Sequence, residues 1–269
     1  MCKAKMKRGH MNTPQKTYDH FSQVSSSYRK MRTTDKEPII FISESLKNLF
    51  GVKAADVGCG AGRYDLLLFQ NLNKLHLTCI DINDSMLQEA SNYLKSSGFS
   101  NFQTIKANAN EIPLEKNSLD CIFTFNAIHH FDFVKFLEKS SEVIIEGGKI
   151  FIYTRLRSQN SRNIWGQHFP SFSEIETRLY ELDEIENWIQ SNGNLKLETI
   201  KQFKYKRTST LERLVEKAKG KHYSTFSLYE NNALNESLKI FQENIKMRFP
   251  DVRQIEWYDE NILFTLRSK

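Results

Sequence analysis

Short apolar runs recur at regular intervals through the first part of the chain, and residues typical of turns separate them. They predict five strands, at residues 52–57, 75–80, 101–106, 119–125 and 149–154. The run at 119–125 is apolar almost throughout, which is typical of a strand covered on both faces.

Helical patterns lie between these strands. Hydrophobic side chains spaced about 3.6 residues apart predict helices at residues 63–72, 83–97 and 132–146. Asp84 or Ser85 is placed to cap the second of these helices, and Gly98 suits the position just past its end. Strands that alternate with helices form parallel sheets through right-handed crossovers. We therefore predict a doubly wound α/β fold.

The pattern is less regular after residue 155. Late strands at 195–203 and 262–266 would bring the sheet to seven strands, most of them parallel. The sequence Ser173-Glu174-Ile175-Glu176 resembles a capping box at the start of a helix. Further helices are predicted at 183–191, at about 209–219 and at 231–248.

Composition narrows the class of protein. Hydrophobic residues make up 39% of the 269 positions, enough for a sizeable core, and the net charge is +6. Such a surplus can attract nucleic acid, acidic metabolites or a carrier-linked acyl group, although it is modest for a chain of this size. No apolar stretch approaches the roughly 18 residues of a membrane span. The four cysteines lack metal-binding spacing, so we expect a cytoplasmic protein with no bound metal.

A glycine-rich turn follows the first predicted strand. In Asp56-Val57-Gly58-Cys59-Gly60-Ala61-Gly62-Arg63, the glycines allow a sharp bend and close approach to a ligand, and the next helix presents free N–H groups. Dinucleotide sites use GxGxxG spacing, whereas the third glycine here comes one residue early. An ordinary strand-to-helix turn remains the alternative.

Asp81 ends the second predicted strand, nineteen residues after Gly62. A carboxylate at this place can accept hydrogen bonds from both hydroxyls of a ribose, each contributing roughly 1.5–3 kcal/mol. Its alternative role is to help cap the helix at Asn83. The loops at 108–113 and 126–131 fall at the same carboxyl edge of the sheet, where doubly wound folds bind ligands.

The order of these motifs resembles the class I S-adenosylmethionine-dependent methyltransferases. The glycine turn, the acidic residue, the residue-108 loop and the histidine after the fourth strand are most similar to the small-molecule branch, which includes quinone-biosynthesis, trans-aconitate and malonyl-carrier-protein methyltransferases. The resemblance covers about residues 18–155. It implies a Rossmann-like methyltransferase fold, S-adenosylmethionine as cofactor, and methyl transfer to a small-molecule acceptor through an O-, N- or C-nucleophile or a carboxylate.

The chain shows no internal repeats and no low-complexity linker, so we expect one domain at 16–269 after a flexible arm at 1–15. Residues 16–50 would form a helical lid and 51–155 the cofactor-binding core. Residues 156–269 would supply a helical substrate cap and the closing strands.

The resemblance also assigns a set of cofactor contacts. Asp81 would hold the ribose, Ile82 would pack on adenine, and the residue-108 loop would read the adenine edge. The family commonly has Asp where this chain has Asn108, so that hydrogen bond would lack a charge. The expected contacts are Asp56, Gly58, Cys59, Gly60, Arg63, Asp81, Ile82, Met86, Asn108, Ala109, Asn126, Tyr18 and Arg29.

Candidate catalytic residues come from two segments. His129 and His130 follow the fourth strand, and His130 is a candidate base, with hydrogen bonding or cofactor contact as the alternative for either. In the N-terminal lid, Tyr28 would face the methyl group, and Arg29 or Arg32 the cofactor carboxylate or an acidic substrate. An amphipathic helix with solvated arginines is the alternative.

Two other functions remain open. An RNA methyltransferase is supported only by charge, including the basic run from Lys201 to Arg207, which is more often a solvated face. The Asn/Asp-Pro-Pro-aromatic signature of enzymes that methylate base amino groups is missing after the fourth strand. A non-catalytic cofactor-binding subunit is the second alternative.

Overall fold

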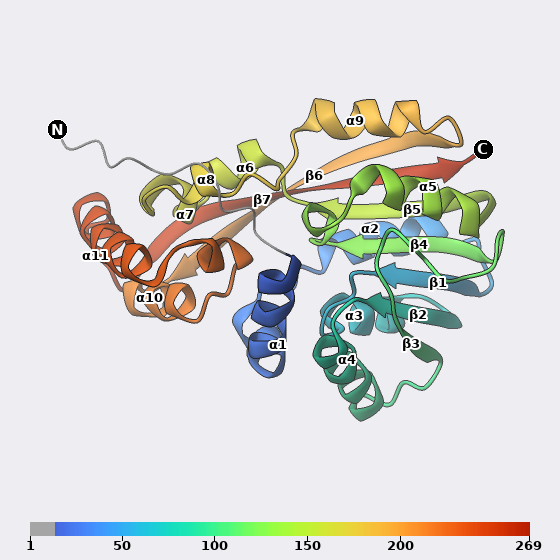
Figure 1. Cartoon of the computed structure of the whole chain (residues 1–269), viewed down its shortest axis with the longest axis horizontal. Coiled ribbons are helices and arrows are strands. Elements are labelled where there is room, and N and C mark those ends of the chain that lie inside the picture. Colours follow the sequence, from blue (N-terminus) through green and yellow to red (C-terminus); the bar gives the residue numbers. More distant parts are fainter. Residues whose placement is uncertain (1–13) are drawn as a thin grey trace.

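The computed structural model describes residues 14–269, which are built on a single seven-stranded sheet of order β3-β2-β1-β4-β5-β7-β6 (Figure 1). Neighbouring strands among β1 to β5 pair in parallel, and β7 is antiparallel to both of its neighbours. The strands are β1 (Val52–Val57), β2 (Leu75–Asp81), β3 (Phe102–Lys106), β4 (Leu119–Phe125), β5 (Ile144–Thr154), β6 (Leu195–Ser209) and β7 (Ile255–Ser268). The predicted fold class is confirmed.

Helices fill the crossovers and extend beyond them. The predicted arm at residues 1–15 lies almost wholly outside the described residues, and α1 begins at Pro14. The helices are α1 (Pro14–Met31), α2 (Glu37–Leu46), α3 (Arg63–Asn71), α4 (Asp84–Ser96), η1 (Ile128–His130), α5 (Phe133–Val143), α6 (Arg157–Arg162), α7 (Ile164–His168), α8 (Phe172–Ile175), α9 (Leu182–Ser191), α10 (Leu211–Lys219), η2 (Ser224–Leu228) and α11 (Asn231–Arg248). Within residues 14–269, no helix is both long and apolar enough to cross a membrane.

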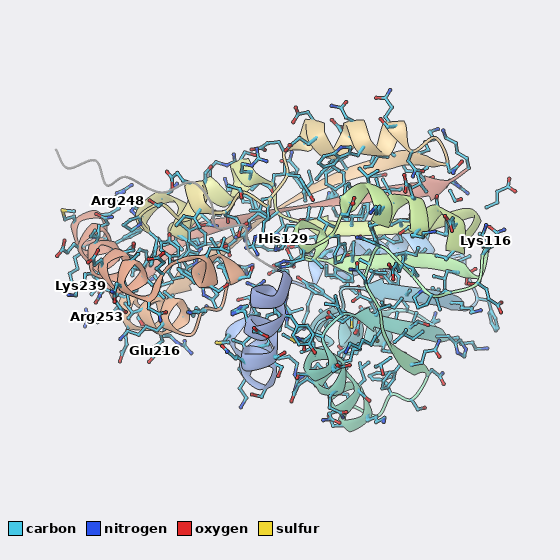
Figure 2. The ribbon with its side chains drawn as sticks, viewed as in Figure 1. Lys116, His129, Glu216, Lys239, Arg248 and Arg253 are labelled. Carbon is cyan, nitrogen blue, oxygen red and sulfur yellow. The ribbon has the colours of Figure 1, made fainter. Side chains whose placement is uncertain are left out.

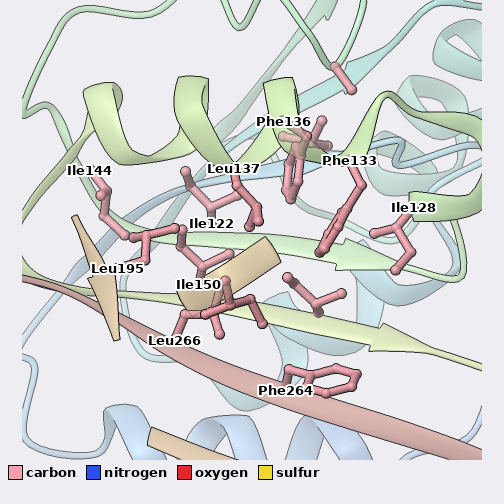
Figure 3. Close-up of a cluster of buried hydrophobic side chains, with 14 of the residues drawn as sticks. Ile122, Ile128, Phe133, Phe136, Leu137, Ile144, Ile150, Leu195, Phe264 and Leu266 are labelled. Carbon is pink, nitrogen blue, oxygen red and sulfur yellow. The ribbon is translucent and has the colours of Figure 1, made fainter. Parts of the chain in front are cut away.

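Hydrophobic side chains cover both faces of the sheet. On one face, Phe136 and Leu137 of α5 pack towards Ile122 and Ile150 of the central strands (Figure 3). Helix α9 adds buried side chains to the same cluster, and α2 and α3 cover the opposite face. Burial on both faces explains why the inner strands are apolar almost throughout.

Three local predictions were wrong. Helix α4 is capped by Asn83, whose side chain accepts a hydrogen bond from Met86 N at 3.1 Å, and not by Asp84 or Ser85. The expected capping box at residues 173–176 does not form, because the short helix α8 begins at Phe172 without a side-chain cap. The helix predicted at 132–146 ends at Val143, and the residues after it already belong to β5.

The last two strands are longer than predicted. β5 pairs with β7 only over residues 149–154, whereas β6 and β7 are paired from Leu195 and Ser268 to Ser209 and Ile255. The extension forms a two-stranded ribbon with one exposed polar face, so its sequence carries only a weak hydrophobic signal.

A helical lobe packs on this ribbon, beside α1 and away from the sheet (Figure 1). It consists of α7, α8, α10, η2 and α11, and its core combines aromatic rings with aliphatic side chains. The Trp165 ring stacks on Phe241 with centroids 5.0 Å apart, and Phe169 and Phe226 lie around them. The lobe therefore has its own hydrophobic cluster.

We predict that Phe241→Ala lowers the free energy of unfolding by about 3–5 kcal/mol, because it removes a fully buried ring from this cluster. Chemical denaturation followed by circular dichroism measures the loss. Met247→Ala on the same helix is the control, since Met247 is 79% exposed and should change stability little. Equal stabilities of the two variants would contradict a packed lobe.

Candidate functional site

A cavity of about 410 Å³ lies at the carboxyl ends of β1, β2 and β4. This is the edge at which the sequence placed the ligand. Fourteen of the fifteen predicted site residues line it, namely Tyr18, Tyr28, Asp56, Gly58, Cys59, Gly60, Arg63, Asp81, Ile82, Met86, Asn108, Ala109, Asn126 and His130. The remaining one is Arg29.

The three glycines of the turn have different surroundings. A Cβ on Gly58 would lie 2.6 Å from the Cβ of Ala127, and one on Gly62 would lie 3.2 Å from the Cβ of Ala90. Both glycines therefore allow close packing within the protein. At Gly60 the nearest atom to such a Cβ is Tyr28 Cε1 at 3.9 Å, so this glycine opens onto the cavity.

Asp81 fixes the shape of the cavity floor. One carboxylate oxygen accepts a hydrogen bond from Gly60 N and the other from Asn83 N, both at 2.9 Å. Burial raises the pKa of Asp81, although these backbone N–H groups favour its ionised form. Each oxygen keeps a free lone pair, so the carboxylate can still accept hydrogen bonds from a diol. The structural role and the predicted ligand role are compatible.

The adenine end of the predicted site is apolar. Ile82 is 50% exposed, which is unusual for a large apolar side chain lining a cavity, and Met86 and Ala109 are buried beside it. A flat apolar ligand group would cover this surface. The Oδ1 of Asn108 accepts a hydrogen bond from Asn110 N at 3.0 Å, so the amide that would read the adenine edge is held in a local turn.

Two buried carboxyl groups, those of Asp56 and Asp65, lie beneath the glycine turn. Asp56 was among the predicted site residues, but Asp65 was not. Burial raises the pKa of each carboxyl. The negative charge of Asp65 raises the pKa of Asp56 further, because two neighbouring carboxylates cannot both ionise at low cost. Cys79 Sγ also contacts Asp65 at 3.3 Å. Asp56 thus borders the cavity while its carboxyl is engaged below it.

Arg29 was predicted to contact the cofactor, but the structure places it elsewhere. Its guanidinium donates hydrogen bonds to the carbonyl oxygens of Ala61 and Glu89, pairs with the Glu89 carboxylate at 3.2 Å and stacks on Tyr93. These contacts tie α1 to α4, and Arg29 lies outside the residues that line the cavity. The helical stripe could place Arg29 on α1 but could not show which helix would face it.

Tyr28 borders the cavity between two cations. The guanidinium carbons of Arg32 and Arg63 each lie 5.5 Å from its ring centroid. Burial opposes ionisation of the phenol, but Arg32 and Arg63 outweigh it and leave the pKa of Tyr28 below its ordinary value. Arg63 also donates hydrogen bonds to Thr33 O and Thr34 Oγ1, which fixes the link between α1 and α2.

Both histidines after β4 line the cavity. The His130 ring lies edge-on to Phe21 with centroids 5.3 Å apart, and it contacts His129. Burial, with smaller effects from neighbouring positive charges, holds the pKa of each imidazole well below its usual range. Both rings are therefore neutral at neutral pH.

A second cavity of about 150 Å³ adjoins the first. Arg63, Tyr64, Asn126 and His129 line both cavities, and His129 lies near the middle of the molecule, between the sheet and the helical lobe (Figure 2). His129 lines both cavities, whereas His130, the candidate base, lines only the larger one.

Many of the residues that line the second cavity come after residue 154 in the sequence. From residues 155–172, Arg155, Asn160 and Trp165 line it. The predicted substrate cap at 156–269 includes the lobe, but the basic run that ends at Arg207 was interpreted as a solvated face. Pairing of β6 with β7 places Arg207 beside Asp259 at this cavity, and helix α10 supplies Lys217.

Comparison with known proteins agrees with this geometry. The family model of a methyltransferase domain matches residues 55–152. A demethylmenaquinone methyltransferase of Bacillus subtilis is 26% identical over 137 residues, and a putative methyltransferase of Dictyostelium discoideum is 28% identical over 142. These alignments cover 50% and 53% of this chain but only 57% and 51% of the relatives, so the chain matches little more than half of their length.

Solved structures extend the likeness to the whole fold. A putative methyltransferase from an antibiotic biosynthesis pathway of Anabaena variabilis superposes with a TM-score of 0.66 at 20% identity, covering 89% of this chain and 99% of that one. The [4+2]-cyclase SpnF superposes with a TM-score of 0.65 at 13% identity, covering 95% and 97%. At such identities the likeness shows the fold alone. The sequence match therefore assigns a methyltransferase domain to residues 55–152, and the solved structures show that the rest of the chain shares the fold of such proteins.

Proposed function

We propose that the protein binds S-adenosylmethionine in the larger cavity and transfers its methyl group to a small-molecule acceptor held in the smaller one. The observation that carries this proposal is the junction of the two cavities at Asn126 and His129. There the larger cavity, with its turn of three glycines and the buried Asp81 carboxylate, adjoins the smaller, polar cavity. Such an arrangement suits transfer of a group between two bound molecules.

The residues of the larger cavity fit the cofactor that the family uses. Asp81 would accept hydrogen bonds from the ribose hydroxyls, Ile82 would pack on adenine, and Gly60 would leave room for the ligand backbone. Arg63 is placed to bind the methionine carboxylate, because it borders both cavities and its described partners are neutral oxygens.

When bound, the cofactor supplies a methyl group that its sulfonium has already activated. The protein therefore has mainly to hold the acceptor in line and to exclude water, and positioning of this kind can lower a barrier by roughly 7–11 kcal/mol. Helix α1 serves the second task, since Phe21 and Tyr28 border the cavity from the side opposite the sheet. These residues would act as a lid.

A base is needed only for acceptors that must lose a proton. His130 is retained as a candidate, and His129 joins it because it borders both cavities. Their lowered pKa values keep both rings in the neutral, proton-accepting form. Tyr28 contacts the same space and would help to place the methyl group.

Surface charge favours a small acceptor over RNA. Along the basic run of β6, Lys204 pairs with Glu260, Lys206 with Glu256, and Arg207 with Asp35. These ion pairs reduce the positive strip that would follow a phosphate backbone.

We predict that Asp81→Asn weakens binding of S-adenosylmethionine at least about tenfold, because the ribose loses charge-assisted hydrogen bonds. Isothermal titration calorimetry measures the affinity. Asp120→Asn is the matched control, since Asp120 also accepts a backbone N–H, from Lys53, but lies outside the set lining the cavity. Unchanged affinity in Asp81→Asn would remove Asp81 from the cofactor site, and no binding by the wild-type protein would refute the proposed function.

The neutral state of His130 has a consequence for stability. Because its folded pKa lies below the unfolded value of about 6.5, the unfolded chain takes up a proton that the native chain does not. This contribution to stability is present above pH 6.5 and is lost as the pH falls. Between pH 7.5 and 5.5, we predict that the wild type loses about 1 kcal/mol more stability than His130→Gln, measured by urea denaturation. Equal losses would show that His130 titrates normally.

A further inference from the structure

The smaller cavity is rich in charge of both signs. Five cationic side chains and three carboxylates line it among residues 14–269. Unpaired carboxylates would favour a cationic acceptor, and unpaired cations an anionic one. The partners of each group therefore decide what the cavity can bind.

All three carboxylates are committed to protein donors. Asp35 takes two hydrogen bonds from Arg207 Nη2, at 2.7 and 2.9 Å. Asp259 accepts from Arg207 Nε and from Trp257 Nε1, both at 3.2 Å, and it lies 3.6 Å from Arg155.

The third carboxylate, Glu176, is 2% exposed. It pairs with Arg178 and accepts a hydrogen bond from Thr225 Oγ1 at 2.6 Å. These contacts hold the pKa of Glu176 below its usual value despite its burial. Each carboxylate described at this cavity is thus already paired with an arginine, and none carries an unpaired negative charge that would favour a ligand cation.

Three of the cations have no carboxylate partner within the described part of the chain. Arg63 is placed to serve the cofactor. Arg32 donates a hydrogen bond to His222 O at 3.0 Å and stacks on Tyr223 with 4.5 Å to the centroid, so its partners are neutral. Lys217 is half-buried, and its ammonium makes no ion pair or hydrogen bond with any residue from 14 to 269.

One residue ties Arg32 and Lys217 together. The backbone N and the ring Nδ1 of His222 both bond to Lys217 O, at 3.1 and 3.0 Å, while His222 O accepts from Arg32. Burial, with the neighbouring charges of Arg213, Arg207 and Arg32, lowers the pKa of Lys217, although Asp259 opposes the shift. His222 thus links the Arg32 guanidinium to the backbone of Lys217, and both side chains line the smaller cavity.

The bound cofactor would not balance this charge. S-adenosylmethionine carries two positive groups and one carboxylate, and that carboxylate is served by Arg63 in the other cavity. We propose that the smaller cavity binds a compact acceptor through an anionic carboxylate or phosphate group, with Lys217 and Arg32 as its binding cations. This inference rests on the proposed function, and it makes Lys217 a residue that determines acceptor specificity. The volume of about 150 Å³ favours a small molecule over one with a long apolar chain.

The experiment uses the full chain saturated with S-adenosylhomocysteine, into which inorganic phosphate and malonate are titrated by calorimetry. We expect at least one of these anions to bind, and Lys217→Met to weaken that binding at least about tenfold while affinity for S-adenosylhomocysteine stays the same. Lys219→Met is the matched control, because Lys219 is exposed on the same helix and lies outside the cavity lining. Retained affinity for S-adenosylhomocysteine also shows that each variant is folded.

The outcomes separate the two proposals. If S-adenosylhomocysteine does not bind the wild type, the proposed function fails. If it binds but neither anion does, or if Lys217→Met and Lys219→Met bind anions equally, only the anionic acceptor is overturned. Transfer of labelled methyl groups to small carboxylic acids and phosphate esters, but not to neutral alcohols, amines or quinols, would support it, and the reverse preference would overturn it.

Discussion

The rest of the site depends on the two hydrogen bonds that Asp81 accepts from backbone N–H groups. One fixes Gly60 in the turn after β1, and the other fixes Asn83, which in turn caps α4. A single carboxylate therefore holds the ends of two neighbouring strands and the start of a helix in one arrangement. Because its oxygens keep free lone pairs, the group that builds the cavity floor can also bind a ligand there.

The sequence predicted the central sheet well because its strands are buried on both faces. β1 and β4 were predicted at their observed ends, and the glycine turn and Asp81 follow directly from those ends. The cap of α4 was misplaced by one residue, since Asn83, Asp84 and Ser85 are all good capping types and only the backbone geometry selects among them. The hydrophobic pattern predicts that a helix or strand is present more reliably than it predicts the residue at which that element begins or ends.

Residues whose partners are distant in sequence were not predictable in the same way. Arg29 meets Glu89, sixty residues away, and Arg207 meets Asp35 across 172 positions, so neither contact leaves a local signal. The ribbon of β6 and β7 raised a related difficulty, because its exposed face dilutes the hydrophobic pattern. Its basic residues were read as solvated, whereas the pairing of the two strands turns Arg207 towards Asp35 and Asp259.

The two cavities are built from different parts of the chain. Turns at the ends of the parallel strands make most of the larger one, whereas the ribbon and the helical lobe supply Arg207, Lys217 and His222 to the smaller one. The lobe has its own hydrophobic core, so changes in its cavity-facing side chains need not disturb the turn at Gly60. Acceptor preference can therefore change through the lobe while the cofactor cavity stays the same, provided that the shared residues, His129 and Asn126 among them, are kept.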